Sequence, residues 1–263
     1  MQAAWKYLRS PLTIGGILAG QMYHAINRSD LPYLPDQDPS GVFGDQHLPP
    51  LRITVMGDSS VTAPGVDPLE DAWAQRTALH LSDRYRVDLV IVAAGGSRIQ
   101  DIIDDQLERA LATEPDIVWL AMGGNDALRG TPVSRFERQY REVVTVLNDR
   151  ISVVGCSGIG DLGTIPRLPA LTRGVVRVRG RSFDRAIARA IHPFPRTRKT
   201  IAWGPQWAGF ENDLETFAGD LFHASAKGHR LFADHGTIPV MEELVSLREE
   251  LRSDPRGSVG SSR

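Results

Sequence analysis

Ser59, Asp220 and His223 are the residues whose types and spacing point most directly to chemistry. Ser59 closes the tripeptide 57–59, Gly-Asp-Ser, which follows the apolar run 51–56. A serine hydroxyl becomes a useful nucleophile when an imidazole accepts its proton and a carboxylate fixes the tautomer of that imidazole. Asp220 and His223, three residues apart ahead of a predicted helix, supply both groups from one loop. The set predicts nucleophilic catalysis by Ser59.

Each of these residues has a simpler explanation when it is taken alone. Asp58 and Ser59 are typical helix-capping residues, and a single histidine is more often exposed or packed than reactive. His229 and His235 follow His223 at six-residue intervals. That spacing rotates around a helix, so no metal site is predicted.

Small and polar residues also follow two further predicted strands. Residues 95–97 are Gly-Gly-Ser, and residues 123–126 are Gly-Gly-Asn-Asp. The carboxyl ends of parallel strands meet at one edge of a sheet, so we expect both segments to lie near Ser59. Glycine lets a backbone N–H approach a ligand, and the Asn125 amide is a second donor. With the N–H of Ser59 they predict an oxyanion hole, although a tight turn explains each glycine separately.

The elements that must position these residues alternate along the chain. From residue 51 onward, short apolar runs alternate with amphipathic segments, which is typical of a parallel sheet covered by helices. Strands are expected at 51–56, 87–94, 117–122, 151–155 and 200–203. Helices are expected at 68–83, 99–111, 134–148, 176–191, after 223, and at 241–251. The 99–111 helix carries an apolar stripe that includes Gln106, and Ser134 with Glu137 has the spacing of a capping box.

Composition limits the classes of protein that this chain can be. With 263 residues and 41% hydrophobic content, it can bury one substantial core, so one domain is expected. The net charge of -2 excludes a chain-wide basic field, and no nucleic-acid partner is predicted. Cys156 is the single cysteine, which excludes an internal disulfide and a Cys-rich zinc site.

The first 50 residues are expected to form a helix and a Pro-rich linker ahead of a domain at 51–252. Lys6 and Arg9 precede an apolar run, but no small-x-small cleavage site follows, and the run is shorter than the ~20 residues that span a bilayer. We expect residues 5–26 to dock on the domain or lie at a membrane surface, in a cytoplasmic or membrane-associated protein; export is the alternative. Residues 253–263 are expected to fray into a disordered tail.

Four segments, in their order along the chain, resemble the blocks of the SGNH, or GDSL-type, hydrolase family. They are Gly57-Asp58-Ser59, Gly96, Gly124-Asn125-Asp126, and Asp220 with His223. The resemblance implies a three-layer α/β/α fold with a flavodoxin-like parallel sheet of about five strands. It implies that Ser59 is the nucleophile and that His223 and Asp220 complete the triad. The N–H groups of Ser59 and Gly96 and the Asn125 side chain would form the oxyanion hole, with Gly95 as the alternative to Gly96.

The expected function is therefore hydrolysis of a carboxylic ester, or alternatively a thioester, through an acyl-serine intermediate. This chemistry needs no cofactor and no metal. The expected substrate is a small-molecule, lipid or carbohydrate ester. Two alternatives stay open: an acyltransferase that uses a sugar or lipid hydroxyl as acceptor, and a non-catalytic binding module on the same fold.

Three further patterns lie between the fourth strand and the Asp220 loop. Residues 158–163 fit Gly-x-Gly-x-x-Gly, but Pro166 and Pro169 prevent a helix from starting there, so we expect a loop over the site instead of a dinucleotide site. Arginines are dense between 167 and 199, which predicts a solvated helix face or, alternatively, a surface that attracts anionic substrates or lipid headgroups. Aromatic residues that either line an acyl pocket or pack the catalytic loop are Trp203, Trp207, Phe210 and Phe217.

Overall fold

The structure is a computed structural model that describes residues 16–17, 20–21, 23–25 and 27–253. Its centre is a six-stranded sheet with the order β1-β3-β2-β4-β5-β6. The strands are β1 (Gly41–Phe43), β2 (Pro50–Gly57), β3 (Arg86–Ile91), β4 (Ile117–Ala121), β5 (Val153–Cys156) and β6 (Thr197–Lys199). β1 pairs antiparallel with β3, and the other neighbours pair in parallel. The predicted α/β class and parallel sheet are confirmed, with one more strand than expected.

Helices connect the parallel strands. The α-helices are α3 (Ser59–Thr62), α4 (Trp73–Leu81), α5 (Ile99–Asp101), α6 (Leu107–Ala112), α7 (Gly124–Leu128), α8 (Val133–Arg150), α9 (Ala170–Ile191), α10 (Gly209–Asn212), α11 (Ala226–Phe232) and α12 (Ile238–Ser253). The shorter 3-10 turns are η1 (Leu69–Asp71), η3 (Leu162–Thr164), η4 (Pro205–Trp207) and η5 (Leu214–Thr216), and the π-helical turns are η2 (Ile102–Gln106) and η6 (Ala233–Thr237).

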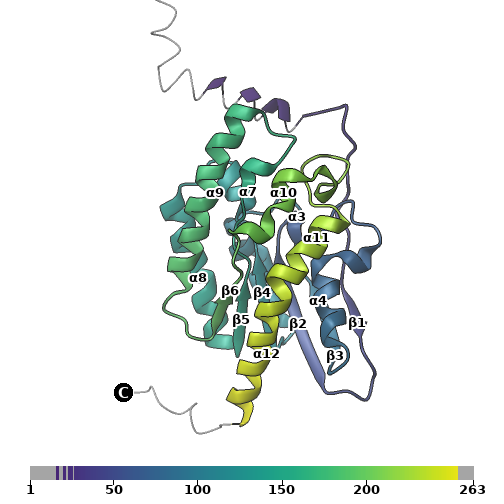
Figure 1. The fold of residues 1–263 in the computed structure, drawn as a ribbon. Helices are drawn as coiled ribbons and strands as arrows, with labels where there is room; N and C mark the ends of the chain where they lie inside the picture. Colours follow the sequence, from purple (N-terminus) through teal and green to yellow (C-terminus); the bar gives the residue numbers. More distant parts are fainter. Residues whose placement is uncertain (1–15, 18–19, 22, 26, 254–263) are drawn as a thin grey trace, which may run out of the picture.

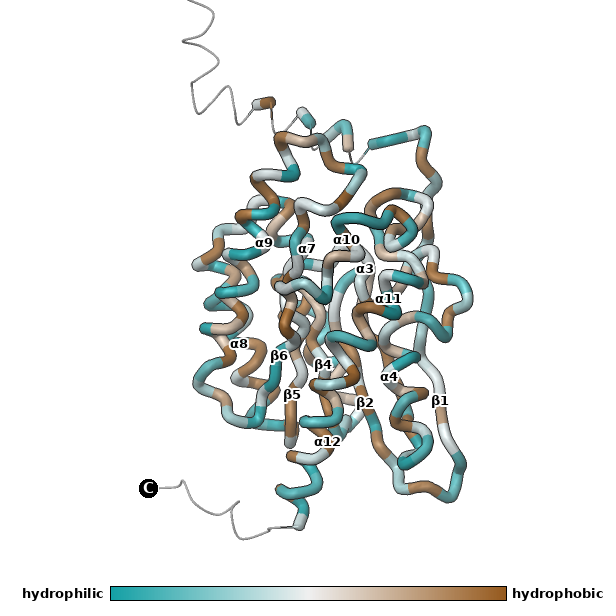
Figure 2. The backbone as a smooth tube through the Cα atoms, viewed as in Figure 1, coloured by the Kyte–Doolittle hydropathy of each residue, from teal (hydrophilic) through white to brown (hydrophobic). Residues whose placement is uncertain are grey.

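Both faces of the sheet are covered because its central strands are apolar on both sides. All five residues of β4 are buried, and successive side chains along a strand point to opposite faces. Trp119 packs on one face with residues of α4 and α12, whereas Leu120 packs on the other with residues of α8 and α9. Figure 1 shows α8 and α9 on one side of the strands and α4 and α12 on the other, and Figure 2 shows the apolar colouring concentrated on the strands. The result is the predicted three-layer arrangement.

The carboxyl ends of the parallel strands lie together at one end of the molecule. Gly57, the last residue of β2, pairs with Ala121, the last residue of β4. The short helices α3 and α7 follow these two strands directly, and α10 and α11 lie at the same end, in the upper half of Figure 1. This is the edge at which open α/β sheets hold ligands.

Several predicted elements differ from the structure. The 99–111 helix is divided into α5, η2 and α6, and the 176–191 helix begins at Ala170. The fifth parallel strand is Thr197–Lys199, not 200–203. The expected capping box fails because α8 begins at Val133, ahead of Ser134, and Glu137 forms an ion pair with Arg189 at 2.6 Å instead. The first helix, expected over 68–83, is divided into η1 and α4 by Ala72, whose backbone is extended.

The Pro-rich segment before β2 is not a free linker along its length. Residues 41–43 form the edge strand β1, and the Asp36 carboxylate accepts one hydrogen bond from a side chain of the domain and one from its backbone. The described residues between 16 and 25 are helical, and Gln21 and Ala25 contact the domain: Gln21 accepts a hydrogen bond from Thr172 at 2.8 Å, and Ala25 is buried. At these residues the docked placement is the observed one. The rest of the predicted 5–26 helix and the predicted tail at 254–263 lie outside the described residues.

None of the helices in the described ranges is long and apolar enough to cross a membrane.

Candidate active site

The turn after β2 fixes Ser59 at the carboxyl edge of the sheet. A Cβ atom on Gly57 would lie 2.1 Å from the carbonyl oxygen of Ala121, so only glycine fits where the two strands end. Asp58 caps α3 by accepting the N–H of Ser60 at 2.9 Å, and Ser59 is the first residue of that helix. Burial raises the pKa of Asp58 against the opposing effect of its hydrogen bonds from Ser60. The capping interpretation and the placement of Ser59 at the edge therefore both hold.

The loop ahead of α11 joins Asp220 and His223 into one unit. The Oδ2 atom of Asp220 lies 2.7 Å from Nδ1 of His223, and its Oδ1 atom accepts the N–H groups of Phe222 and His223, each at 3.0 Å. Burial acts to raise the pKa of Asp220, but the hydrogen bonds from the side chain and backbone of His223 and from Phe222 outweigh it, so the pKa lies below its usual value. Asp220 is thus an ionised carboxylate that orients the His223 ring.

The same loop holds one residue in an unusual backbone conformation. Leu221 has φ = +59°, in the left-handed region that side chains other than glycine rarely adopt. Its carbonyl accepts the N–H of Arg167 at 3.0 Å, and the Arg167 guanidinium lies 3.8 Å from Asp220 Oδ2. Arg167 therefore supports both the turn and the charge of the carboxylate.

The three predicted oxyanion donors come from the Ser59 turn, the Gly96 turn and helix α7. Within the described part of the chain, the backbone N–H groups of Ser59 and Gly96 make no hydrogen bond. Gly96 has φ = +76°, which requires glycine there. The Asn125 amide donates to Ser97 O at 3.2 Å and to Asp58 Oδ2 at 3.3 Å, both at the long end of the range, so it lies between the Ser59 turn and the Gly96 turn.

Gln106 is a buried residue that sequence reasoning placed in an apolar stripe without assigning it a role. It is 1% exposed and stands in the π-helical turn η2. Its Oε1 atom accepts the N–H of Gly57 at 2.8 Å, and its Nε2 atom donates to Gly57 O at 2.9 Å and to Ser97 Oγ at 3.1 Å. Gln106 thus ties the Ser59 turn to the Gly96 turn. A polar residue inside an apolar helical stripe was the available signal.

Asp36 was also missed, because it lies in the segment interpreted as a linker. Its Oδ1 atom accepts the Thr62 hydroxyl at 2.6 Å, and its Oδ2 atom accepts the N–H of Gly95 at 2.8 Å. The neighbouring Gln37 donates to the carbonyl of Ala63 at 2.6 Å. These contacts brace α3 and fix the glycine pair from outside the sheet. Gly95, the alternative oxyanion donor, has its N–H committed to Asp36, which favours Gly96.

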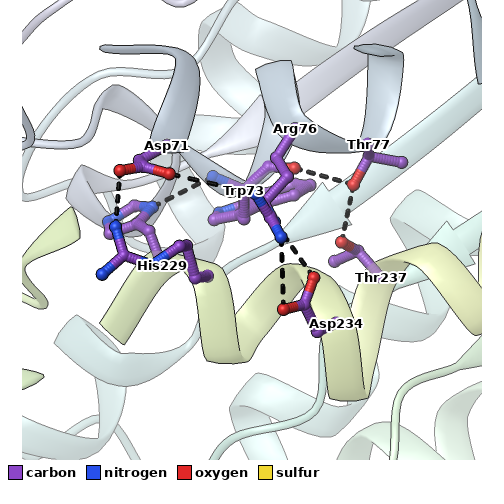
Figure 3. Close-up of polar contacts among 8 residues, drawn as sticks. Asp71, Trp73, Arg76, Thr77, His229, Asp234 and Thr237 are labelled. Carbon is purple, nitrogen blue, oxygen red and sulfur yellow. Dashed lines mark hydrogen bonds and ion pairs between the residues drawn. The ribbon is translucent and has the colours of Figure 1, made fainter. Parts of the chain in front are cut away.

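His229 lies in a different network, between α4 and the segment of α11 and η6 (Figure 3). Its Nδ1 atom accepts the backbone N–H of Trp73 at 3.2 Å, which is the first N–H of α4. Burial, with a smaller contribution from the nearby His223, lowers the pKa of His229 to about 3. Other contacts that join the same two segments in Figure 3 are the Arg76–Asp234 ion pair at 3.0 Å and the Thr77–Thr237 hydrogen bond at 2.8 Å.

A cavity of about 830 Å³ opens at this edge of the sheet. Ser59, Asn125 and His223 line it, as do the four aromatic residues predicted for an acyl pocket and the 158–162 part of the predicted overhanging loop. Ser59 Oγ and His223 make no hydrogen bond to each other in the described structure, although both face the cavity. Catalytic hydrogen bonds are often long until substrate is bound. No cluster of three or more His, Cys, Asp or Glu side chains in the described residues is placed to hold a metal ion.

The sequence model of the "GDSL-like Lipase/Acylhydrolase family" matches residues 55–231. That range is about two thirds of the chain and contains all the predicted site residues. No curated protein sequence matches the chain.

Solved structures with the same fold include LAE5, Axe2 and TesA. LAE5, an alpha/beta hydrolase enzyme from the metagenome of Lake Arreo, Spain, has a TM-score of 0.57 and 16% identity, over 77% of this chain and 96% of its own. Axe2, an acetylxylan esterase from Geobacillus stearothermophilus, has a TM-score of 0.56 and 16% identity, over 76% and 96%. TesA has a TM-score of 0.60 and 20% identity, over 74% and 99%. At these identities the likeness shows the fold.

Proposed function

Because the chain belongs to the GDSL-like lipase/acylhydrolase family, whose members act on esters, we propose that it hydrolyses carboxylic esters through an acyl-Ser59 intermediate. One observation carries the proposal. His223, whose Nδ1 atom lies 2.7 Å from Oδ2 of the buried Asp220, lines the same cavity as Ser59. A histidine held by an ionised carboxylate beside a serine is the arrangement that acyl transfer needs.

The two steps of the reaction follow from the protons that these groups hold. Nδ1–H of His223 donates to Asp220, so Nε2 carries a lone pair and accepts the Ser59 proton. The Ser59 oxygen then bonds to the ester carbon, and the alkoxide of the alcohol part leaves with the proton from His223. In the second step His223 takes a proton from water, the hydroxide attacks the acyl carbon, and Ser59 regains its proton as the acid leaves.

The oxyanion of each tetrahedral intermediate would be held by the N–H groups of Ser59 and Gly96 and by the Asn125 amide. The lack of a partner for both backbone N–H groups in the described structure supports this role, because such donors cost no rearrangement when charge develops. The two long hydrogen bonds of Asn125 support it as well, since a weakly held amide is easily redirected.

The apolar lining of the cavity supports a substrate whose acyl chain is longer than acetyl and binds in this cavity. Trp203, Trp207, Phe210 and Phe217 line it together with aliphatic residues such as Ile159 and Leu162. A cavity of about 830 Å³ is in the range that small-molecule sites occupy. The fold is shared with an acetylxylan esterase, so a short acyl group on a carbohydrate is the competing class of substrate.

A panel of p-nitrophenyl esters from acetate to palmitate tests the proposal. We expect kcat/KM to rise with chain length up to medium chains and to vanish in the Ser59→Ala variant. Equal labelling of wild type and Ser59→Ala by a fluorophosphonate probe would place the nucleophile elsewhere. No labelling and no hydrolysis at all would favour a non-catalytic binding module. Transfer of the acyl group to an added alcohol at the expense of free acid would make the protein an acyltransferase.

A further inference from the structure

Helix α9 lines the cavity with three arginines one turn apart. Arg177, Arg181 and Arg185 follow one another at four-residue intervals, so they share one face of the helix. All three line the cavity that also holds Ser59 and His223. The density of arginine in this helix is therefore not only a solvated face, because part of it borders the candidate active site.

The three arginines differ in how their charge is met. Arg177 lies 2.7 Å from Asp161 and 3.6 Å from Glu211, so its charge is compensated. Across the described residues, Arg181 and Arg185 make no ion pair with a carboxylate. Asp184, the acid next to Arg185 in sequence, is bound at 2.7 Å by Lys199. Two positive charges thus face the cavity without an acidic partner.

Arg181 is also held in place. Its guanidinium lies 4.5 Å from the centroid of the Trp203 ring, a cation–π arrangement that leaves the edge of the guanidinium free to donate. The Trp203 indole N–H in turn donates to Ile159 O at 2.9 Å. A planar donor fixed on an aromatic face, with a second arginine four residues away at ~6 Å along the helix axis, suits a tetrahedral oxyanion.

We propose that Arg181 and Arg185 form a subsite for a phosphate group carried by the alcohol or thiol part of the substrate, with the acyl chain in the aromatic part of the cavity. The proposal deepens the proposed function and rests on it. It makes the preferred substrate an acyl ester or thioester whose leaving group is phosphorylated. The headgroup of a lysophospholipid and the phosphates of a coenzyme A thioester are two sources of that one chemistry.

Matched substrate pairs test the subsite. One pair is 1-lauroyl-lysophosphatidic acid and 1-lauroylglycerol; the other is lauroyl-coenzyme A and the lauroyl thioester of N-acetylcysteamine. In at least one pair we expect wild type to prefer the phosphate-bearing member, and the pair identifies the source. Changing Arg181→Gln and Arg185→Gln together should lower that preference about five- to thirtyfold, mainly through KM. Raising the salt concentration should weaken the wild-type preference, because the site is exposed to solvent.

Arg173→Gln is the matched control, because Arg173 is on α9 but does not line the cavity. The subsite is refuted if neither pair shows a preference, or if the double variant and the control change the preference equally. Binding of dodecyl phosphate and of a neutral dodecyl glycerol ether, measured by calorimetry on Ser59→Ala, needs no turnover. One outcome separates the two proposals. If dodecyl phosphate binds more tightly than the neutral ether, the double variant loses this preference, and wild type hydrolyses no ester, then the proposed function is refuted and the subsite stands. Equal binding of the two probes would refute the subsite whatever the enzyme hydrolyses.

Discussion

His223 and His229 are six residues apart and both face the same cavity, yet their surroundings are opposite. His223 is partly exposed, and its Nδ1 atom lies 2.7 Å from a carboxylate. His229 is 1% exposed, and its Nδ1 atom accepts a backbone N–H at 3.2 Å. A carboxylate partner lets an imidazole gain a second proton, whereas a buried N–H donor with no compensating charge prevents it.

The comparison shows that the partner of one ring nitrogen decides what the other can do. In His223 the Nδ1 proton is held by Asp220, so the lone pair is on Nε2, where a serine proton can be accepted. In His229 the lone pair is on Nδ1 and is already used by Trp73 N–H. The Nε2 atom of His223 is therefore left to accept a proton, whereas the Nδ1 atom of His229 accepts the first N–H of helix α4.

The largest test of this division is Ser59→Ala. If Ser59 is the nucleophile whose proton His223 accepts, turnover should fall by about 10⁴-fold or more. The fold should persist, because a partly exposed serine at a strand edge contributes little to packing. Steady-state rates on the best ester and the melting temperature measure both. Ser60→Ala is the control, because Ser60 is the next residue of α3 and lines the same cavity; this variant should keep most activity. If the Ser59→Ala enzyme kept a tenth of the wild-type rate, Ser59 would not be the nucleophile, and His223 would have no serine proton to accept.

The direct test substitutes each histidine in turn. His223→Ala should lower kcat/KM by about 10²–10⁴-fold, the contribution of a general base, and should flatten the acidic limb of the pH–rate profile. His229→Asn should keep that limb and lose less than about tenfold in rate, since the asparagine oxygen can still accept the Trp73 N–H. Should His229→Asn be the variant that loses the limb, the assignment of Asp220 and His223 is wrong.

Asn125→Ala sharpens the comparison on the oxyanion side. Loss of one oxyanion donor typically costs about 10²–10³ in kcat with little change in KM, and we expect that result here. Initial rates over a range of substrate concentrations separate the two constants. A change confined to KM would assign Asn125 to ground-state binding.

The smallest expected effect is on stability and belongs to His229. Its pKa falls from 6.5 to about 3 on folding, so below pH 6.5 the unfolded chain binds a proton that the folded protein refuses. Stability therefore falls as pH falls through that window, and this residue should account for about 2 kcal/mol between pH 7 and pH 5. Urea unfolding at both pH values should show that loss in wild type and a smaller one in His229→Asn. Equal losses in the two proteins would mean that His229 is not the group refusing the proton.

The sequence predicted the parts of the fold and site that leave a local signal. Buried parallel strands appear in the sequence as apolar runs, and residues at their ends must meet at one edge, so the proximity of Ser59 and Asn125 could be predicted. The Asp220–His223 contact could be predicted from their spacing of three residues. β6 was misplaced because it is an edge strand of polar residues and lies next to the apolar run 201–203, of which Ala202 and Trp203 line the cavity instead. The division at Ala72 depends on His229, which is distant in sequence. The roles of Gln106 and Asp36 likewise exist only once remote turns are brought to them.

Asp36 and Gln37 give the enzyme a physical boundary that differs from the boundary of its family match. The match starts at residue 55, whereas the contacts that brace α3 and Gly95 come from residues 36 and 37, and the edge strand begins at residue 41. A chain truncated to begin at Leu51 would retain every segment by which the family is recognised. It would nevertheless leave the N–H of Gly95 and the hydroxyl of Thr62 without their acceptor, and β3 would become the open edge of the sheet. Truncation and fusion points for this protein are therefore better set ahead of Asp36 than at the start of the family match.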